Sequence, residues 1–124
     1  MVYDLAIIGG GPAGVGAGVY AARKKIRTIF ITTNFENQST VSDNIQNWIG
    51  TPSIKGTDLA KNLEDHLRTY ANDAVDIHVK ETVSSIVKNT DNSFHIITNK
   101  GEYDAKAVLV TTGSIRKKIT VPGA

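Results

Sequence analysis

The residues best suited to chemistry are six consecutive small ones near the N-terminus, Gly9-Gly-Gly-Pro-Ala-Gly14. They carry the spacing GxGxxG and lie between an apolar run and a helix-like run. In such a turn the first glycine permits a tight bend, the second lets a pyrophosphate approach the backbone, and the third lets the helix pack against the strand. Pro12 suits the first helical turn, whose free N–H groups would hold phosphates. This stretch therefore predicts a dinucleotide-binding loop.

The flanking elements support that prediction. Residues 3–8 are short and Ile-rich, which is typical of a buried parallel strand. Residues 12–24 predict a helix whose small side chains favour close packing on a sheet, and residues 27–32 predict the next strand. The result is a βαβ unit of the length that the fingerprint requires. The alternative is a strand–helix turn that binds nothing, because glycine-rich turns are common.

A dinucleotide site also needs a group for the adenosine ribose. That group is normally an acidic residue about 20 positions after the last glycine. The position here holds Thr33, and the next acidic residue, Glu36, follows in the loop. A threonine hydroxyl can hydrogen-bond a ribose, and a carboxylate can reach back from the loop. We therefore expect Thr33 or Glu36 to be the ribose contact.

The remaining chain predicts an α/β fold of the Rossmann-like type, a parallel sheet with flanking helices plus a small antiparallel β-meander. A long polar connection over 34–56 precedes a helix that we expect to begin with Thr57 as N-cap and to end near Ala71. The strands that we expect after it are 75–79, 82–88, 93–98, a short one near Glu102-Tyr103, and 107–112 ending at Gly113.

Composition excludes several classes of protein. The 124 residues predict one domain, and a net charge of +2 with dispersed basic residues gives no support for a nucleic-acid partner. No apolar run approaches the roughly 20 residues that span a bilayer, so we expect no membrane partner and a cytoplasmic location. The chain has no cysteines, and the absence of a GxSxG motif gives no support for hydrolase chemistry. The three histidines lack metal-ligand spacing, so we expect no metal.

Three segments in order resemble the FAD-binding domain of the thioredoxin reductase-like flavoprotein disulfide reductases. The pattern also occurs in the flavoprotein subunit of alkyl hydroperoxide reductase. The first segment is 3–14 with Tyr20-Ala-Ala-Arg23, and the second, Ile45-Gln-Asn-Trp-Ile-Gly50, is similar to the family's ENWPG or ENYPG. The third runs from 107–114 to Val121-Pro-Gly123 and is similar to the family's strand ending in ATG and its PG hinge.

The resemblance implies positions for an FAD cofactor. Its pyrophosphate would meet the glycine loop and the turn at Thr112 and Gly113, and its isoalloxazine ring would lie near Asn47. Gln38 matches the glutamine of the family's GGQ motif, and Val83 falls where the adenine is met. The implied cofactor-binding residues are Gly9, Gly10, Gly11, Pro12, Ala13, Gly14, Thr33, Glu36, Gln38, Asn47, Val83, Thr112 and Gly113.

The sequence departs from the family in two ways. Glu36 and Asn37 stand where the family has glycines before the glutamine, and their side chains would crowd or repel a pyrophosphate. We therefore expect the isolated chain to bind FAD weakly. In this family a nicotinamide domain, which binds NAD(P)H, follows the PG hinge, and the FAD domain then resumes. We interpret residues 1–124 as one FAD-binding domain that is an incomplete fragment of a larger flavoenzyme.

The implied function is the FAD-binding part of an NAD(P)H-dependent oxidoreductase of the thioredoxin reductase type. Its partners would be FAD and the rest of the parent chain, and the parent could form a homodimer. Two alternatives stay open: a fragment of a thioredoxin reductase-like ferredoxin–NADP reductase without redox cysteines, or a non-catalytic nucleotide-binding module. With one glycine fingerprint and no cysteine, we assign no catalytic residue and expect no turnover from the chain alone.

Overall fold

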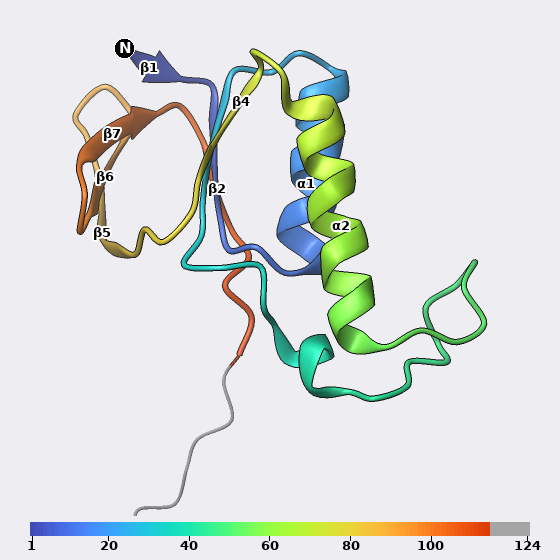
Figure 1. Cartoon of the computed structure of the whole chain (residues 1–124). Coiled ribbons are helices and arrows are strands. Elements are labelled where there is room, and N and C mark those ends of the chain that lie inside the picture. The colour runs from blue at the N-terminus through green and yellow to red at the C-terminus, as the bar shows by residue number, and fades with distance from the viewer. Residues whose placement is uncertain (115–124) are drawn as a thin grey trace, which may run out of the picture.

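A four-stranded parallel sheet lies at the centre of the computed structural model, which describes residues 1–114 (Figure 1). Its strands are β2 (Leu5–Ile8), β3 (Thr28–Ile31), β4 (Val75–His78) and β8 (Val108–Val110), in the order β4-β3-β2-β8. β3 is buried along its whole length, as expected for a parallel strand covered on both faces. The register aligns the carboxyl ends of all four strands at one edge of the sheet.

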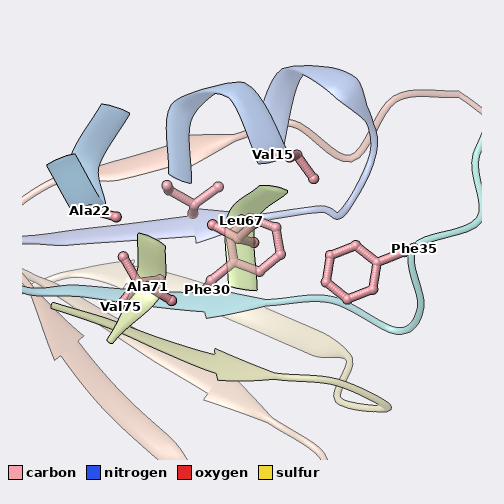
Figure 2. Close-up of a cluster of buried hydrophobic side chains, with 8 residues drawn as sticks. Val15, Ala22, Phe30, Phe35, Leu67, Ala71 and Val75 are labelled. Carbon is pink, nitrogen blue, oxygen red and sulfur yellow. The ribbon is translucent and has the colours of Figure 1, made fainter. Parts of the chain in front are cut away.

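Two helices cover one face of this sheet, α1 (Pro12–Arg23) and α2 (Gly56–Ala71) (Figure 1). The small residues of α1 allow a close approach: a Cβ on Gly18 would lie 2.7 Å from Leu67 Cδ1 and 3.4 Å from the Phe30 ring. Figure 2 shows the apolar cluster that the two helices and the sheet bury between them. Its buried members are Ile7, Val15, Ala22, Phe30, Phe35, Leu67, Ala71 and Val75.

A second sheet covers the opposite face (Figure 1). It contains β1 (Val2–Tyr3), β5 (Val83–Lys88), β6 (Phe94–Thr98) and β7 (Glu102–Ala105) in the order β1-β7-β6-β5. Strands β5, β6 and β7 form an antiparallel meander, and β1 joins β7 in parallel. A second buried cluster fills the space between the sheets: Tyr3, Ala6, Ile8, Ile29, Ile31, Ile96 and Ala105. The Rossmann-like architecture with an added meander is therefore confirmed.

Two local predictions were wrong. The single strand expected over 3–8 is two strands, because β1 pairs with β7 while β2 pairs with β3 and β8. The helix α2 begins at Gly56 with Lys55 as N-cap and without a side-chain cap, so Thr57 is not the N-cap. The N–H of Gly56 donates to Ser42 O at 2.8 Å, and with this tertiary bond the helix begins two residues earlier than predicted.

The long connection between β3 and α2 is partly ordered by its own hydrogen bonds. A 3-10 turn, η1 (Gln38–Val41), is followed by an arm, residues 42–55, that projects beyond the N-terminal end of α2 (Figure 1). Ile45 and Ile54 close the arm through two backbone hydrogen bonds of 2.7 and 3.0 Å. Within residues 1–114, neither helix has the length and apolar character needed to cross a membrane.

Candidate functional site

The glycine loop, residues 9–14, follows β2 and includes the first turn of α1, at the carboxyl edge of the parallel sheet. Gly9 has φ +114°, a left-handed conformation that side chains rarely adopt, and a Cβ there would lie 2.2 Å from Thr111 O. A Cβ on Gly14 would lie 1.9 Å from Gly9 O. These two glycines therefore allow the tight turn and the close approach of helix and strand.

Neighbouring strands hold the loop from both sides. The Gly9 N–H donates to Ile31 O of β3 at 3.0 Å. On the other side, the Thr111 hydroxyl lies 2.9 Å from Ile8 O and 3.2 Å from Gly9 O, either of which can accept its proton. Gly10 is crowded as well, since a Cβ there would lie 2.7 Å from Thr32 Oγ1 and 2.8 Å from Asn34 O. The backbone of the loop is thus fixed before any ligand arrives.

Gly11 is less crowded than Gly9, Gly10 and Gly14, because the atoms nearest to a Cβ there belong to a side chain in ordinary contact. It is the N-cap of α1, with Pro12 in the first turn and no side-chain cap or acidic residue there. The first-turn N–H groups of a helix have no intrahelical partner and carry partial positive charge, so they attract an anion. Within the part of the chain that the structure describes, a Cβ on Gly11 would meet only the Asn37 side chain, at 3.4 Å. This arrangement can bind a phosphate or pyrophosphate group.

The two residues that depart from the family pattern lie close to this opening. Asn37 is the neighbour of Gly11, and its side-chain amide donates to Phe35 O at 3.2 Å. Glu36 is exposed, and its backbone N–H donates to Asn34 Oδ1 at 2.9 Å. The structure therefore places Asn37 where a side chain narrows the approach to Gly11.

The predicted ribose contact lies at the end of β3. Thr33 is exposed, and its hydroxyl lies 3.2 Å from the hydroxyl of Thr82, a residue from the segment that enters β5. Val83 follows directly, half-buried against the core between the sheets. The exposed Thr112 and Gly113 follow Thr111, and the Thr112 nitrogen lies beside Gly9. These predicted residues thus gather at one edge of the sheet.

Two predicted residues are less closely connected to the loop. Gln38 begins η1 directly after Asn37. Asn47 is exposed in the projecting arm, and none of the hydrogen bonds described for residues 1–114 joins its side chain to the glycine loop (Figure 1). The predicted segment Val121-Pro-Gly123 lies outside the described residues.

A pocket of about 520 Å³ adjoins the site between the loop after β3 and the N-terminal half of α2. Glu36 is the predicted site residue that lines this pocket. The lining residues are Asn34, Phe35, Glu36, Thr40, Thr57, Ala60, Lys61, Glu64 and Val79. A larger hollow of about 680 Å³ lies on the meander, beside His95 and Asp104, and none of the predicted site residues lines it.

Sequence reasoning missed two threonines of the site, Thr32 and Thr111. The Thr32 hydroxyl lies beside Gly10, and the Thr111 hydroxyl lies within hydrogen-bond distance of Ile8 O and Gly9 O. A threonine that follows a strand is too common in sequences to indicate a site. Only the pairing of β3 and β8 with β2 brings them to the glycines. Thr111 directly precedes Thr112, which the sequence does predict as a site residue. The apolar strand that ends in Thr-Thr-Gly is therefore the signal that could have indicated Thr111.

The glycine loop contributes backbone groups and no titratable side chain, since residues 9–14 are glycine, proline and alanine. Within residues 1–114, every group with a clearly shifted pKa lies outside the glycine loop: Tyr3, Glu81, Asp91, His95, Tyr103 and Asp104. The described part of the chain also contains no cluster of three metal-ligating side chains.

Known proteins share both the sequence pattern and the fold. Residues 3–124 match the model of the family described as pyridine nucleotide-disulphide oxidoreductase. The chain is 35% identical to the F subunit of alkyl hydroperoxide reductase from Xanthomonas campestris pv. phaseoli, over 98% of this chain and 23% of that protein. It is 31% identical to thioredoxin reductase of Bacillus subtilis, over 98% of this chain and 37% of that protein.

A solved structure agrees with these relatives. The thioredoxin reductase of T. acidophilum superimposes with a TM-score of 0.85 and 35% sequence identity, covering 98% of this chain and 38% of that one. This chain therefore spans about a quarter to two fifths of the proteins that it matches. The glycine loop, the parallel sheet and the meander agree with the match over nearly the whole sequence, and the chain belongs to the pyridine nucleotide-disulphide oxidoreductase family.

Proposed function

We propose that this chain is the FAD-binding part of an NAD(P)H-dependent flavoprotein oxidoreductase of the thioredoxin reductase type. One observation carries the proposal: α1 begins at Gly11 without a side-chain cap, and among the described residues a Cβ on Gly11 would meet only the Asn37 side chain, in ordinary contact. In the parent enzyme FAD would supply the electron-transfer chemistry, while this chain binds and orients it. The proposed contacts of the pyrophosphate are residues 9–14, Thr112 and Gly113.

The proposal extends to the other predicted residues. Thr33 would meet the adenosine ribose, Val83 the adenine, and Asn47 the isoalloxazine ring. Gln38 and Glu36 would lie in the flavin loop. Asn47 would need further segments of the parent protein to complete a flavin site, because the arm projects away from the rest of the chain (Figure 1). We therefore propose that residues 1–124 are one domain of a larger protein, with the remaining chain as partner.

We also propose that the isolated chain binds FAD weakly. The support is the position of Asn37, whose Cβ lies 3.4 Å from the place that a Gly11 Cβ would occupy. Glu36 adds an exposed carboxylate to the same loop, and a carboxylate near a pyrophosphate costs binding free energy through like-charge repulsion. ADP, which contains the phosphates and adenosine without the flavin, is the simpler ligand for a first test.

The test is the variant Gly11→Ala, titrated with ADP by calorimetry beside the wild type. Among the described residues the added methyl group meets only Asn37, in ordinary contact, so the fold should be unchanged, while the methyl occupies the approach of the pyrophosphate. We expect at least a tenfold loss of ADP affinity, equal to about 1.4 kcal/mol. Gly16→Ala, on the same helix, is the matched control, because none of the atoms described for residues 1–114 outside the helix's own backbone lies within 4 Å of a Cβ there. Equal, measurable affinities for all three proteins would refute the phosphate site.

A further inference from the structure

The ribose end of the proposed site contains two hydroxyl groups rather than one. Thr33 Oγ1 and Thr82 Oγ1 lie 3.2 Å apart, and both residues are exposed. They come from different layers of the fold, since Thr33 follows β3 and Thr82 precedes β5 of the meander. Two neighbouring hydroxyls can donate and accept hydrogen bonds, which is what a ribose hydroxyl requires of its partner. Thr82 is absent from the residues that the sequence predicted.

The segment that carries Thr82, residues 79–82, is tied to both sheets. Toward the parallel sheet, the Lys80 N–H donates to Thr33 O at 3.0 Å and the Glu81 N–H donates to Thr32 O at 3.2 Å. Toward the meander, the Thr82 N–H donates to Asn99 Oδ1 at 2.8 Å. The segment therefore sets the position of Thr82 relative to Thr33.

Glu81 anchors this segment from inside. Its side chain is only 3% exposed, and its carboxylate accepts hydrogen bonds from Thr98 Oγ1 and Tyr103 Oη, each at 2.7 Å. His78 Nδ1 lies 3.1 Å from the second carboxylate oxygen. Burial raises the pKa of this carboxyl, but the hydrogen bonds from Thr98, Tyr103 and His78 outweigh it and hold the pKa below its usual value.

A buried carboxylate with this many partners has little freedom to move. His78 ends β4, whereas Thr98 and Tyr103 belong to β6 and β7, so the carboxylate joins the parallel sheet to the meander. The ring of His78 also meets the Tyr103 ring edge-on, at 5.4 Å between centroids. Removing one donor would leave part of a buried charge without its hydrogen bonds, and the segment would shift to recover them.

We propose that Thr82 and Thr33 together recognise the 2′-hydroxyl of an adenosine ribose, and that Glu81, held by Tyr103, is the residue that positions Thr82 for this contact. The inference rests on the proposed nucleotide site and adds to it a contact residue and a positioning residue. Glu81 itself touches no ligand. Its effect on binding passes through the backbone of residues 79–82.

The experiment compares ADP with 2′-deoxy-ADP by calorimetry, and its readout is the ratio of the two affinities. The wild type should prefer ADP by about fivefold, the factor for one net hydrogen bond. Thr82→Val removes the hydroxyl at an exposed position, and Tyr103→Phe removes a donor to Glu81 while keeping the ring. Both variants should bring the ratio close to one. Ser84→Ala, also exposed and two residues from Thr82, should keep the wild-type ratio, because its hydroxyl donates to Ile97 O instead.

The ratio separates a local role from a general loss of stability, because a partly unfolded variant loses affinity for both nucleotides equally. If the wild type binds ADP with no preference over 2′-deoxy-ADP, the ribose contact is refuted and the phosphate site stands. The same conclusion follows if Thr82→Val and Tyr103→Phe both keep the wild-type preference for ADP. If Thr82→Val loses the preference and Tyr103→Phe keeps it, the positioning role of Glu81 is refuted. A wild type that binds neither nucleotide refutes both this inference and the proposed function.

Discussion

At the residue scale, the glycines of the loop have different physical roles that their shared spacing conceals. Gly14 lies against backbone, with 1.9 Å between its ideal Cβ and Gly9 O, whereas the ideal Cβ of Gly11 meets one side chain at 3.4 Å. Backbone atoms of a packed turn cannot move aside as a flexible side chain can. Gly14 is therefore required by the fold, and Gly11 is free to serve a ligand.

A stability measurement tests this division. Gly14→Ala should lower the free energy of unfolding by about 3 kcal/mol, at the upper end of the cost of overpacking, because Gly9 O has to move. Gly16→Ala on the same helix should be neutral or raise it by about 0.5–1 kcal/mol, since alanine is the better helix former. Urea unfolding monitored by circular dichroism measures both. A Gly14→Ala protein as stable as the wild type would contradict the packing described for the loop.

Residue-level sequence reasoning reached the glycines but not their partners. The spacing of Gly9, Gly11 and Gly14 is local, so a motif can report it. Thr82 is 49 positions from Thr33, and the contact between their hydroxyls depends on the packing of two sheets. A buried glutamate in a polar stretch, such as Glu81, looks like a surface residue until its hydroxyl donors are known.

At the element scale, the meander contains a partly exposed histidine that lies between two carboxylates of the neighbouring strand. His95 of β6 lies opposite Asp104 of β7, with 2.9 Å between Nδ1 and Oδ1, and its Nε2 lies 2.9 Å from Glu102 Oε1. Opposed charges across an antiparallel pair stabilise a sheet. Hydrogen bonds that the His95 ring donates to the carboxylates of Glu102 and Asp104 raise the pKa of His95 above 6.5.

The raised pKa predicts a pH-dependent contribution to stability. Since the folded protein holds the proton more tightly, the contribution is complete below the unfolded pKa near 6.5 and is lost as the pH rises through the folded pKa. The stability of the wild type relative to His95→Gln should therefore be larger at about pH 5.5 than at about pH 9. Denaturant unfolding at the two pH values measures it.

The control for this prediction is His66→Gln on α2. The His66 ring is exposed and contacts the Tyr70 ring, with 5.5 Å between centroids, and it lies outside the described ion pairs. Its stability relative to the wild type should change less between the two pH values. The difference in unfolding free energy between the wild type and His95→Gln could instead stay constant or grow toward alkaline pH. Either result would show that the carboxylates of Glu102 and Asp104 do not stabilise the protonated histidine.

Element boundaries show where local patterns stop being informative. The central strands and both helices follow from apolar runs and helical spacing, because burial of those residues decides the local structure. The break at Asp4 has no such signal: Val2 and Tyr3 continue the apolar run, yet they pair with β7 rather than with the parallel sheet. The start of α2 likewise depends on a bond from Gly56 to Ser42, 14 residues earlier.

At the scale of the whole molecule, the parallel sheet lies between two different layers. Helices α1 and α2 cover one face and the meander covers the other (Figure 1). The order of the predicted elements indicated this fold class, because alternating strands and helices followed by a run of strands is typical of it. The carboxyl edge of the sheet, where ligands bind in such folds, then carries residues from both halves of the chain.

The last prediction concerns turnover by the whole chain. Hydride transfer from a nicotinamide to a flavin requires the two groups to be held within about 3–3.5 Å, and that positioning supplies much of the rate. The 124 residues contain one GxGxxG fingerprint, which we assign to FAD, and no cysteine that could accept electrons from the flavin. We therefore expect NADPH consumption by the isolated chain with added FAD, in the presence of a disulfide or dye, to equal that of free FAD.

The measurement is the decrease in NADPH absorbance with and without the protein at the same FAD concentration. The Gly11→Ala variant serves as a second control, since any catalysis that depends on the loop should fall with the methyl group in place. Saturable turnover by the wild type, well above free FAD and lost in Gly11→Ala, would mean that the chain itself binds nicotinamide against the flavin. That result would require a second nucleotide site within these residues, and the assignment of function to a larger parent would have to be abandoned, because function follows from a complete site and not from the fold.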